Sequence, residues 1–207
     1  MPHDLHVFVL DDEPLVVETL ALMLRANGFP VEGFTSPAAF LERPPCDDIA
    51  CLLLDLRLGG QSGLDVQDDL RRRGYSLPIV FLSGKGDVPS TARAMREGAL
   101  DFLVKPVDEP QLLEALARAR EKAVAQQHET RTQRDATARL ALLTKREREI
   151  CDLVAQGMLN KQIAYELGIS EDTVKVHRGR VMHKVHVDSV AALVRLLSDS
   201  QPRRSSS

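Results

Sequence analysis

The chain has 207 residues, of which 43% are hydrophobic and 28% are charged, and its formal net charge is −3. This is the composition of an ordinary soluble globular protein, and the length suits one large domain or two small ones. Because the chain opens with no charged-then-apolar leader and holds no apolar run of about 18 residues, we expect a cytoplasmic protein without a membrane partner.

The charged residues are unevenly distributed along the chain. Residues 1–107 contain 10 Lys/Arg and 16 Asp/Glu, whereas residues 139–207 contain 12 and 8. An acidic front and a basic back predict two domains with different partners, and the basic one is typical of nucleic-acid binding. The three cysteines lack metal-ligand or disulfide spacing, so we expect reduced thiols.

Extended and helical patterns alternate through the first half. We expect strands at residues 5–10, 31–34, 50–54, 78–82 and 100–104. Helical patterns lie between them, and the first shows Leu15, Thr19, Leu22 and Met23 at helical spacing. Five continuously apolar strands that alternate with helices imply a parallel sheet covered on both faces. We therefore expect an α/β doubly wound fold with strand order 2-1-3-4-5.

Chemically active side chains end four of these strands. Asp11 and Asp12 end the first strand, Asp55 the third, Ser83 the fourth and Lys105 the fifth. Ligand sites in such folds lie at the carboxyl ends of the strands, so these residues are expected to converge. Clustered carboxylates favour a Mg²⁺ ion, which with the lysine would balance a phosphoryl group on a carboxylate. The alternative, that acids at strand ends only solvate loops, accounts for one such residue but not for all five together.

Residues 108–143 contain no glycine and are rich in helix-favouring Ala, Arg, Glu and Gln. We expect a long helical linker between the two domains. A stiff linker could pass a change in the first domain to the second, or only hold the two apart.

The last part of the chain predicts four helices. Thr144 and Glu147 fit a capping box at the start of the first, and Asn160 is expected to cap the second. Gly168 ends that second helix, and Ser170 caps a third that runs to about Val185. A fourth helix is expected from about residue 188. Two short helices joined by a tight turn match a helix-turn-helix within an all-α four-helix domain.

The third of these helices has two distinct faces. At about 100° per residue, Val174, Val181 and Val185 point one way. His177 and Arg178 lie at the margins. The opposite face is expected to carry Asp172, Lys175, Val176, Gly179, Arg180 and His183. Cations around an apolar side chain suit entry into the DNA major groove, although a solvated helix face is the alternative.

The first half resembles the receiver domains of two-component response regulators. The resemblance rests on residues 9–14 (Val-Leu-Asp-Asp-Glu-Pro), 53–57 (Leu-Leu-Asp-Leu-Arg), 81–84 (Phe-Leu-Ser-Gly) and 102–106 (Phe-Leu-Val-Lys-Pro). It implies that Asp55 accepts a phosphoryl group from a sensor histidine kinase. It also implies a Mg²⁺ ion held by Asp12, Asp55 and the carbonyl of Arg57, with Asp11 acting partly through water, and it assigns switch roles to Ser83, Phe102 and Lys105. Phe102 has ordinary packing as its alternative role.

Two features depart from the family pattern. Residues 58–63 read Leu-Gly-Gly-Gln-Ser-Gly, where the family commonly has Met-Pro-X-Met-Ser-Gly, and we expect the two glycines to loosen this loop. Lys85 stands where close relatives often carry histidine. It could add positive charge near the pocket, or be a solvated loop residue.

The second half resembles the LuxR-type DNA-binding domain, through residues 143–149 (Leu-Thr-Lys-Arg-Glu-Arg-Glu), 160–164 (Asn-Lys-Gln-Ile-Ala) and 173–178 (Thr-Val-Lys-Val-His-Arg). The resemblance implies that Lys175 and Val176 read bases, and that the DNA backbone is contacted by Lys161, Thr173, Arg178 and Lys184. His177 would pack at the helix edge and could reach a phosphate. Arg180 replaces a frequent asparagine, so the preferred sequence can differ. His183 and His186 share helical spacing, but no carboxylate or cysteine completes a metal site.

Both halves together resemble the NarL/FixJ group, nearest the FixJ and styrene-degradation regulator branch. We expect a receiver domain at 1–120, a helical linker at 121–140, a DNA-binding domain at 141–200 and a disordered tail at 201–207. The implied function is a phosphorylation-activated regulator, not an enzyme, that dimerises and binds double-stranded promoter DNA and RNA polymerase. The rival readings are an aspartyl-phosphate hydrolase, which lacks its Asp-X-Asp-X-Thr stretch here, and a phosphorylation-independent regulator motivated by the glycine loop.

Overall fold

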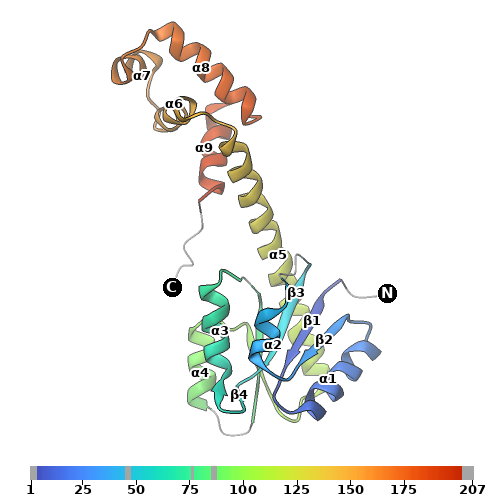
Figure 1. The fold of residues 1–207 in the computed structure, drawn as a ribbon. Helices are drawn as coiled ribbons and strands as arrows, with labels where there is room; N and C mark the ends of the chain where they lie inside the picture. Colours follow the sequence, from blue (N-terminus) through green and yellow to red (C-terminus); the bar gives the residue numbers. More distant parts are fainter. Residues whose placement is uncertain (1–3, 45–47, 76, 85–87, 202–207) are drawn as a thin grey trace. The chain divides into compact units, whose positions relative to one another are not determined.

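The computed structural model describes residues 4–44, 48–75, 77–84 and 88–201. The chain divides into two compact units between Gln127 and His128 (Figure 1). The side chain of Lys85 and the tail from residue 202 lie outside the described residues. None of the described helices is both long and apolar enough to cross a membrane.

The first unit is built on a five-stranded parallel sheet. Its strands are β1 (His6–Leu10), β2 (Val31–Phe34), β3 (Ala50–Asp55), β6 (Ile79–Ser83) and β7 (Asp101–Val104). Their spatial order is β2-β1-β3-β6-β7, which confirms the expected doubly wound order. Every residue of the central strand β3 is buried, as a strand covered on both faces requires.

Helices cover both faces of this sheet. They are α1 (Pro14–Ala26), α2 (Pro37–Glu42), α3 (Gly63–Arg72), α4 (Val88–Arg96) and the long α5 (Glu109–Ala141). Val7 and Val9 of β1 pack in a core with side chains of α1 and α5, whereas Phe8 and Leu10 pack in a second core with α2, α3 and α4. Alternate residues of the strands therefore serve opposite faces, and Figure 1 shows α3 and α4 across the sheet from α1.

The residues whose spacing indicated α1 are not those that the helix buries. Leu15 and Leu22 are 74% and 68% exposed. The buried residues are instead Val17, Leu20, Ala21 and Leu24. This helix carries apolar side chains on more than one face, so spacing alone leaves two possible buried stripes. Packing against the sheet selects the stripe of Val17, Leu20 and Leu24, which joins the core that contains β1.

The glycine loop forms an antiparallel hairpin. β4 (Arg57–Leu58) pairs with β5 (Gln61–Ser62), and the two central residues, Gly59 and Gly60, have φ values of 50° and 110°. Positive φ at both central positions is what a type I′ two-residue hairpin turn demands, and glycine adopts it without a steric penalty. The glycines therefore serve turn geometry, while the expected loosening, which motivated a phosphorylation-independent regulator, concerns motion and stays a prediction.

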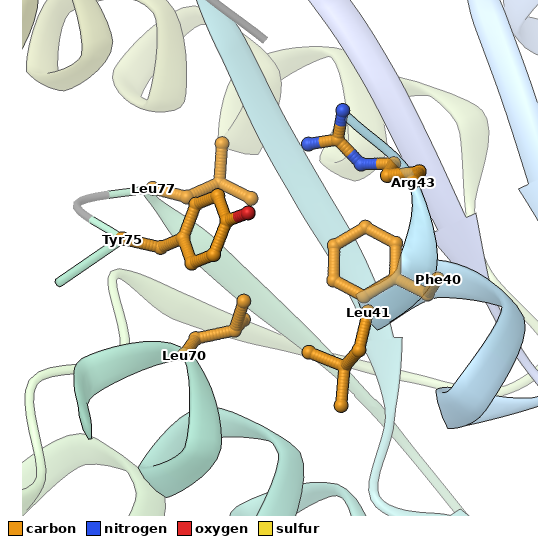
Figure 2. A pocket seen from close by; sticks show the side chains of 6 residues that line it. All are labelled: Phe40, Leu41, Arg43, Leu70, Tyr75 and Leu77. Carbon is orange, nitrogen blue, oxygen red and sulfur yellow. The ribbon is translucent and has the colours of Figure 1, made fainter. Parts of the chain in front are cut away.

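A small hollow lies between the C-terminal ends of α2 and α3. It is lined by Phe40, Leu41, Arg43, Leu70, Tyr75 and Leu77 (Figure 2). The Arg43 guanidinium lies 3.7 Å from the centre of the Phe8 ring. Since the hollow is mainly apolar and its lining includes no carboxylate, it lacks the groups needed for phosphoryl chemistry.

The second unit contains four short helices, α6 (Lys145–Ala155), α7 (Asn160–Leu167), α8 (Glu171–Lys184) and α9 (Val190–Asp199). They share a core with Ala136 and Leu140 from the last turns of α5. Val174, Val181 and Val185 are buried as predicted. The long linker helix and the four-helix domain are thus both confirmed.

Helix caps in the second unit agree with the sequence at two predicted positions and differ at a third. Thr144 Oγ1 accepts from the Glu147 N–H at 3.3 Å, and Ser170 Oγ accepts from the Thr173 N–H at 3.1 Å. Asn160 does not cap α7, because it is already the first helical residue. The preceding Leu159 N–H donates instead to Gln162 Oε1 at 2.8 Å.

Candidate functional site

The carboxyl edge of the sheet brings predicted acidic residues together. Carboxylate oxygens of Asp11, Asp12 and Asp55 lie within 4.8 Å of one another. Lys105, which follows β7, places its Nζ 2.6 Å from Asp11 Oδ2 and 2.8 Å from Asp55 Oδ1. The Lys105–Pro106 peptide bond is cis. Four of the five strand-end residues therefore form one cluster, as the strand order predicts.

Burial and charge act against each other at the strand ends. Asp55 is only 6% exposed, and this burial raises its pKa, while a hydrogen bond from Lys105 and one from the Arg57 N–H lower it in part. Burial lowers the pKa of Lys105, but its bonds to Asp11 and Asp55 outweigh this and leave the pKa raised. The lysine is therefore a cation at neutral pH, fixed between two carboxylates.

Backbone groups hold the carboxylates in place. The Glu13 N–H donates to Asp11 Oδ1, and the Arg57 N–H donates to Asp55 Oδ2, both at 3.0 Å. Asp12 is exposed, and a Cβ built on Gly59 would meet its Oδ2 at 3.3 Å. The hairpin turn thus comes close to the acidic cluster, as expected for the loop that follows Arg57.

Gly63 allows α3 to begin directly against the strand end that carries Asp55. A Cβ at Gly63 would lie 2.2 Å from the Asp55 carbonyl oxygen, a distance that backbone cannot relieve without moving. Nothing in the sequence signals this contact, because the two residues belong to different elements.

We expect Gly63→Ala to lower the free energy of unfolding of the first unit by about 1–3 kcal/mol, the usual range for overpacking. Urea denaturation of the full chain, followed by circular dichroism, measures the change. Gly84→Ala is the matched control, since a Cβ there meets nothing within 4 Å. Equal stability of the two variants would contradict the close approach.

Ser83 and Phe102 lie on the neighbouring strands β6 and β7. Ser83 ends β6 and is 3% exposed, and its carbonyl accepts from the Lys105 N–H at 2.8 Å. Phe102 is 40% exposed. Its ring is therefore not packed as a core side chain, which leaves it room to move.

The third helix of the second unit, α8, presents the face that the sequence predicts. Asp172, Lys175, Gly179, Arg180 and His183 are all exposed, and Val176 is 54% exposed. Lys175 Nζ lies 3.1 Å from Asp172 Oδ1 on the same helix. His177 and Arg178 are half-buried, as expected for the margins.

The residues expected to contact the DNA backbone fall into two groups. Lys161 is exposed on α7, and Thr173 is half-buried in the first turn of α8. Two cations are instead engaged inside the domain: Arg178 donates to Asn160 Oδ1 at 2.8 Å, and Lys184 to Glu147 Oε2 at 2.7 Å. Sequence reasoning identified Glu147 as a capping residue but missed its ion pair.

Comparison with known proteins gives a match for each unit. The family model described as "Response regulator receiver domain" matches residues 7–117, and the one described as "Bacterial regulatory proteins, luxR family" matches residues 141–197. The chain belongs to the NarL/FixJ family of two-component response regulators. It is a phosphorylation-regulated transcriptional regulator, not a catalytic enzyme, with an acidic receiver pocket and a LuxR-type DNA-binding domain.

Individual relatives match over nearly the whole response regulator. Response regulator protein TodT of Pseudomonas putida F1 is 41% identical over 190 residues, which cover 92% of this chain and 84% of TodT. Transcriptional regulatory protein FixJ of Rhizobium meliloti is 40% identical over 93% of this chain and 95% of FixJ. The solved structure of response regulator StyR has a TM-score of 0.78 and 41% identity, covering 95% of this chain and 99% of StyR.

Proposed function

We propose that Asp55 accepts the phosphoryl group from a sensor histidine kinase. The observation that carries this proposal is the Asp55 carboxylate at the end of β3, held between Lys105 Nζ at 2.8 Å and the Arg57 N–H at 3.0 Å. An Asp55 oxygen attacks the phosphorus of a phosphohistidine, the P–N bond breaks, and the imidazole nitrogen keeps the electron pair. Lys105 then pairs with the new phosphoryl oxygens.

The acidic residues fit a Mg²⁺ ion. Their oxygens lie within 4.8 Å of one another, hard oxygen ligands are those that Mg²⁺ prefers, and the exposed Asp12 leaves a side open to metal-bound water. Bound by Asp12, Asp55 and the carbonyl of Arg57, the ion would neutralise charge on the phosphoryl oxygens. Asp11, whose Oδ2 accepts from Lys105 at 2.6 Å, would act on the ion partly through water.

Phosphorylation adds roughly −1.5 to −2 charges at the strand ends. Ser83 turns its hydroxyl toward the phosphoryl group, and the ring of Phe102 moves inward behind it. The exposed surface of α4, β7 and α5 repacks as a consequence, which favours a homodimer. Coupling of about 1–3 kcal/mol between the phosphate and dimerisation suffices for a useful shift.

The dimer places two copies of α8 in successive major grooves of promoter DNA, on half-sites about one helical turn apart. Lys175 and Val176 read bases and Arg180 adjusts the preferred sequence, while Lys161 and Thr173 contact phosphates and His177 packs at the helix edge. RNA polymerase is the further partner. This scheme assigns the receiver to residues 1–120, the linker to 121–140 and the DNA-binding domain to 141–200.

Beryllium fluoride, an acyl-phosphate mimic, tests the receiver assignment. Titration of the full chain with Mg²⁺ and beryllium fluoride should convert monomer to dimer, as measured by light scattering. Neither component alone should do so, because the mimic needs the ion and the ion alone carries no phosphoryl charge. An unchanged oligomeric state with both components present would favour a phosphorylation-independent regulator.

A further inference from the structure

Lys184, the last residue of α8, contacts the start of α6. Its Nζ lies 2.7 Å from Glu147 Oε2 and 3.5 Å from the Leu142 carbonyl. The Glu147 side chain is only 5% exposed, whereas that of Lys184 is 37% exposed. The pair joins α6 to α8 through two residues that are 37 positions apart in the sequence.

Glu147 depends on this partner. Its Oε2 also accepts from the Thr144 N–H at 2.9 Å and from Thr144 Oγ1 at 3.0 Å, so one oxygen receives three donors. These bonds, the one from Lys184 foremost, lower the pKa of Glu147 to about 2. Glu147 is therefore ionised at neutral pH, and removal of Lys184 would leave a buried charge without its cation.

The same pair makes Lys184 a poor phosphate ligand. A lysine that left Glu147 to reach DNA would have to leave that buried carboxylate behind, and while paired it contributes almost no net charge to the DNA-facing surface. Its position agrees with this, because it is half-buried while Lys175 and Arg180 are exposed.

We propose that Lys184 is a positioning residue, which fixes the angle of α8 against α6 through Glu147 rather than contacting DNA. The proposal rests on the assignment of α8 as the recognition helix. The apolar core fixes one side of α8 through Val174 and Val181, and the ion pair fixes its C-terminal end. A tilt of this end would move the exposed reading face relative to the bases.

Salt dependence separates the two roles. Replacing a phosphate-binding lysine by methionine reduces the magnitude of the slope of log affinity against log salt concentration by about 1. We expect Lys184→Met to leave this slope unchanged in the full chain, on duplex sites selected from a random library. The ratio of specific to non-specific affinity should instead fall about threefold to thirtyfold. The exposed Lys161→Met is the matched control, and should lower the slope.

A double-mutant cycle gives an independent readout. Glu147→Gln, Lys184→Met and the double variant are compared for urea unfolding and for the affinity ratio. In both measurements, the loss in the double variant should be smaller than the sum of the losses in the two single variants. Lys184→Arg should retain the ratio of specific to non-specific affinity. A slope lowered by about 1 in Lys184→Met, or strictly additive losses, would overturn the proposal. If α8 were not the recognition helix, Lys175→Met would leave base preference unchanged, which distinguishes that failure from failure of the Lys184 proposal. The urea-unfolding part of the cycle would still test the Glu147–Lys184 ion pair.

Discussion

Asp55→Asn will abolish phosphorylation of the response regulator by acetyl phosphate, together with phosphate-dependent dimerisation and DNA binding. The amide keeps the size and hydrogen-bonding shape of the carboxylate but lacks the nucleophilic anion. Asp55 is buried between Lys105 and the Arg57 N–H, whereas Asp12 is exposed. Asp11 is also buried and bonded to Lys105, so a phosphoryl adduct on Asp55→Asn would identify it as a substitute acceptor.

Intact-protein mass spectrometry after incubation with acetyl phosphate and Mg²⁺ measures the phosphoryl adduct, and light scattering measures the oligomeric state. Asp69→Asn is the control, because it removes an acidic group from the same unit at a half-buried site on α3, where the described contacts pair it with Arg72. It should behave as wild type. A phosphoryl adduct of normal yield on Asp55→Asn would show that another residue is the acceptor.

The receiver site could be predicted because parallel sheets obey a strict positional rule. Asp11, Asp55 and Lys105 are far apart in the sequence, but each follows a strand, and strand order alone brings strand ends together. The exposed face of α8 could also be predicted from the sequence, since the buried Val174 and Val181 fix the phase of this helix.

What the sequence did not reveal depends on contacts between elements. Leu15 and Leu22 have helical spacing, yet the sheet selects another stripe of α1. Gly63 is needed because of a carbonyl on the neighbouring strand end, and Glu147 is tied to a lysine 37 residues away. Periodicity describes a helix in isolation and contains no information about which neighbour a side chain will meet.

The base-reading role of Lys175 leads to the second large effect. Lys175 is paired with Asp172 at 3.1 Å, but both side chains are exposed, at 58% and 90%. An exposed ion pair is worth little, so Lys175 can leave Asp172 at small cost and donate to a guanine edge. While it is paired with Asp172, the Lys175 ammonium stays close to the first turn of α8, where recognition helices contact bases.

Lys175→Met should therefore remove about 1–3 kcal/mol of discrimination at one base pair and leave preferences elsewhere in the half-site intact. Binding of the phosphorylated full chain to a selected duplex and to each of its single-base variants measures this loss. Lys161→Met should lower the affinity for all duplexes by a similar factor, since a phosphate contact carries no base information. If Lys175→Met also weakened every duplex equally and lowered the salt slope, Lys175 would be a phosphate contact, and base reading would have to come from Val176 and Arg180.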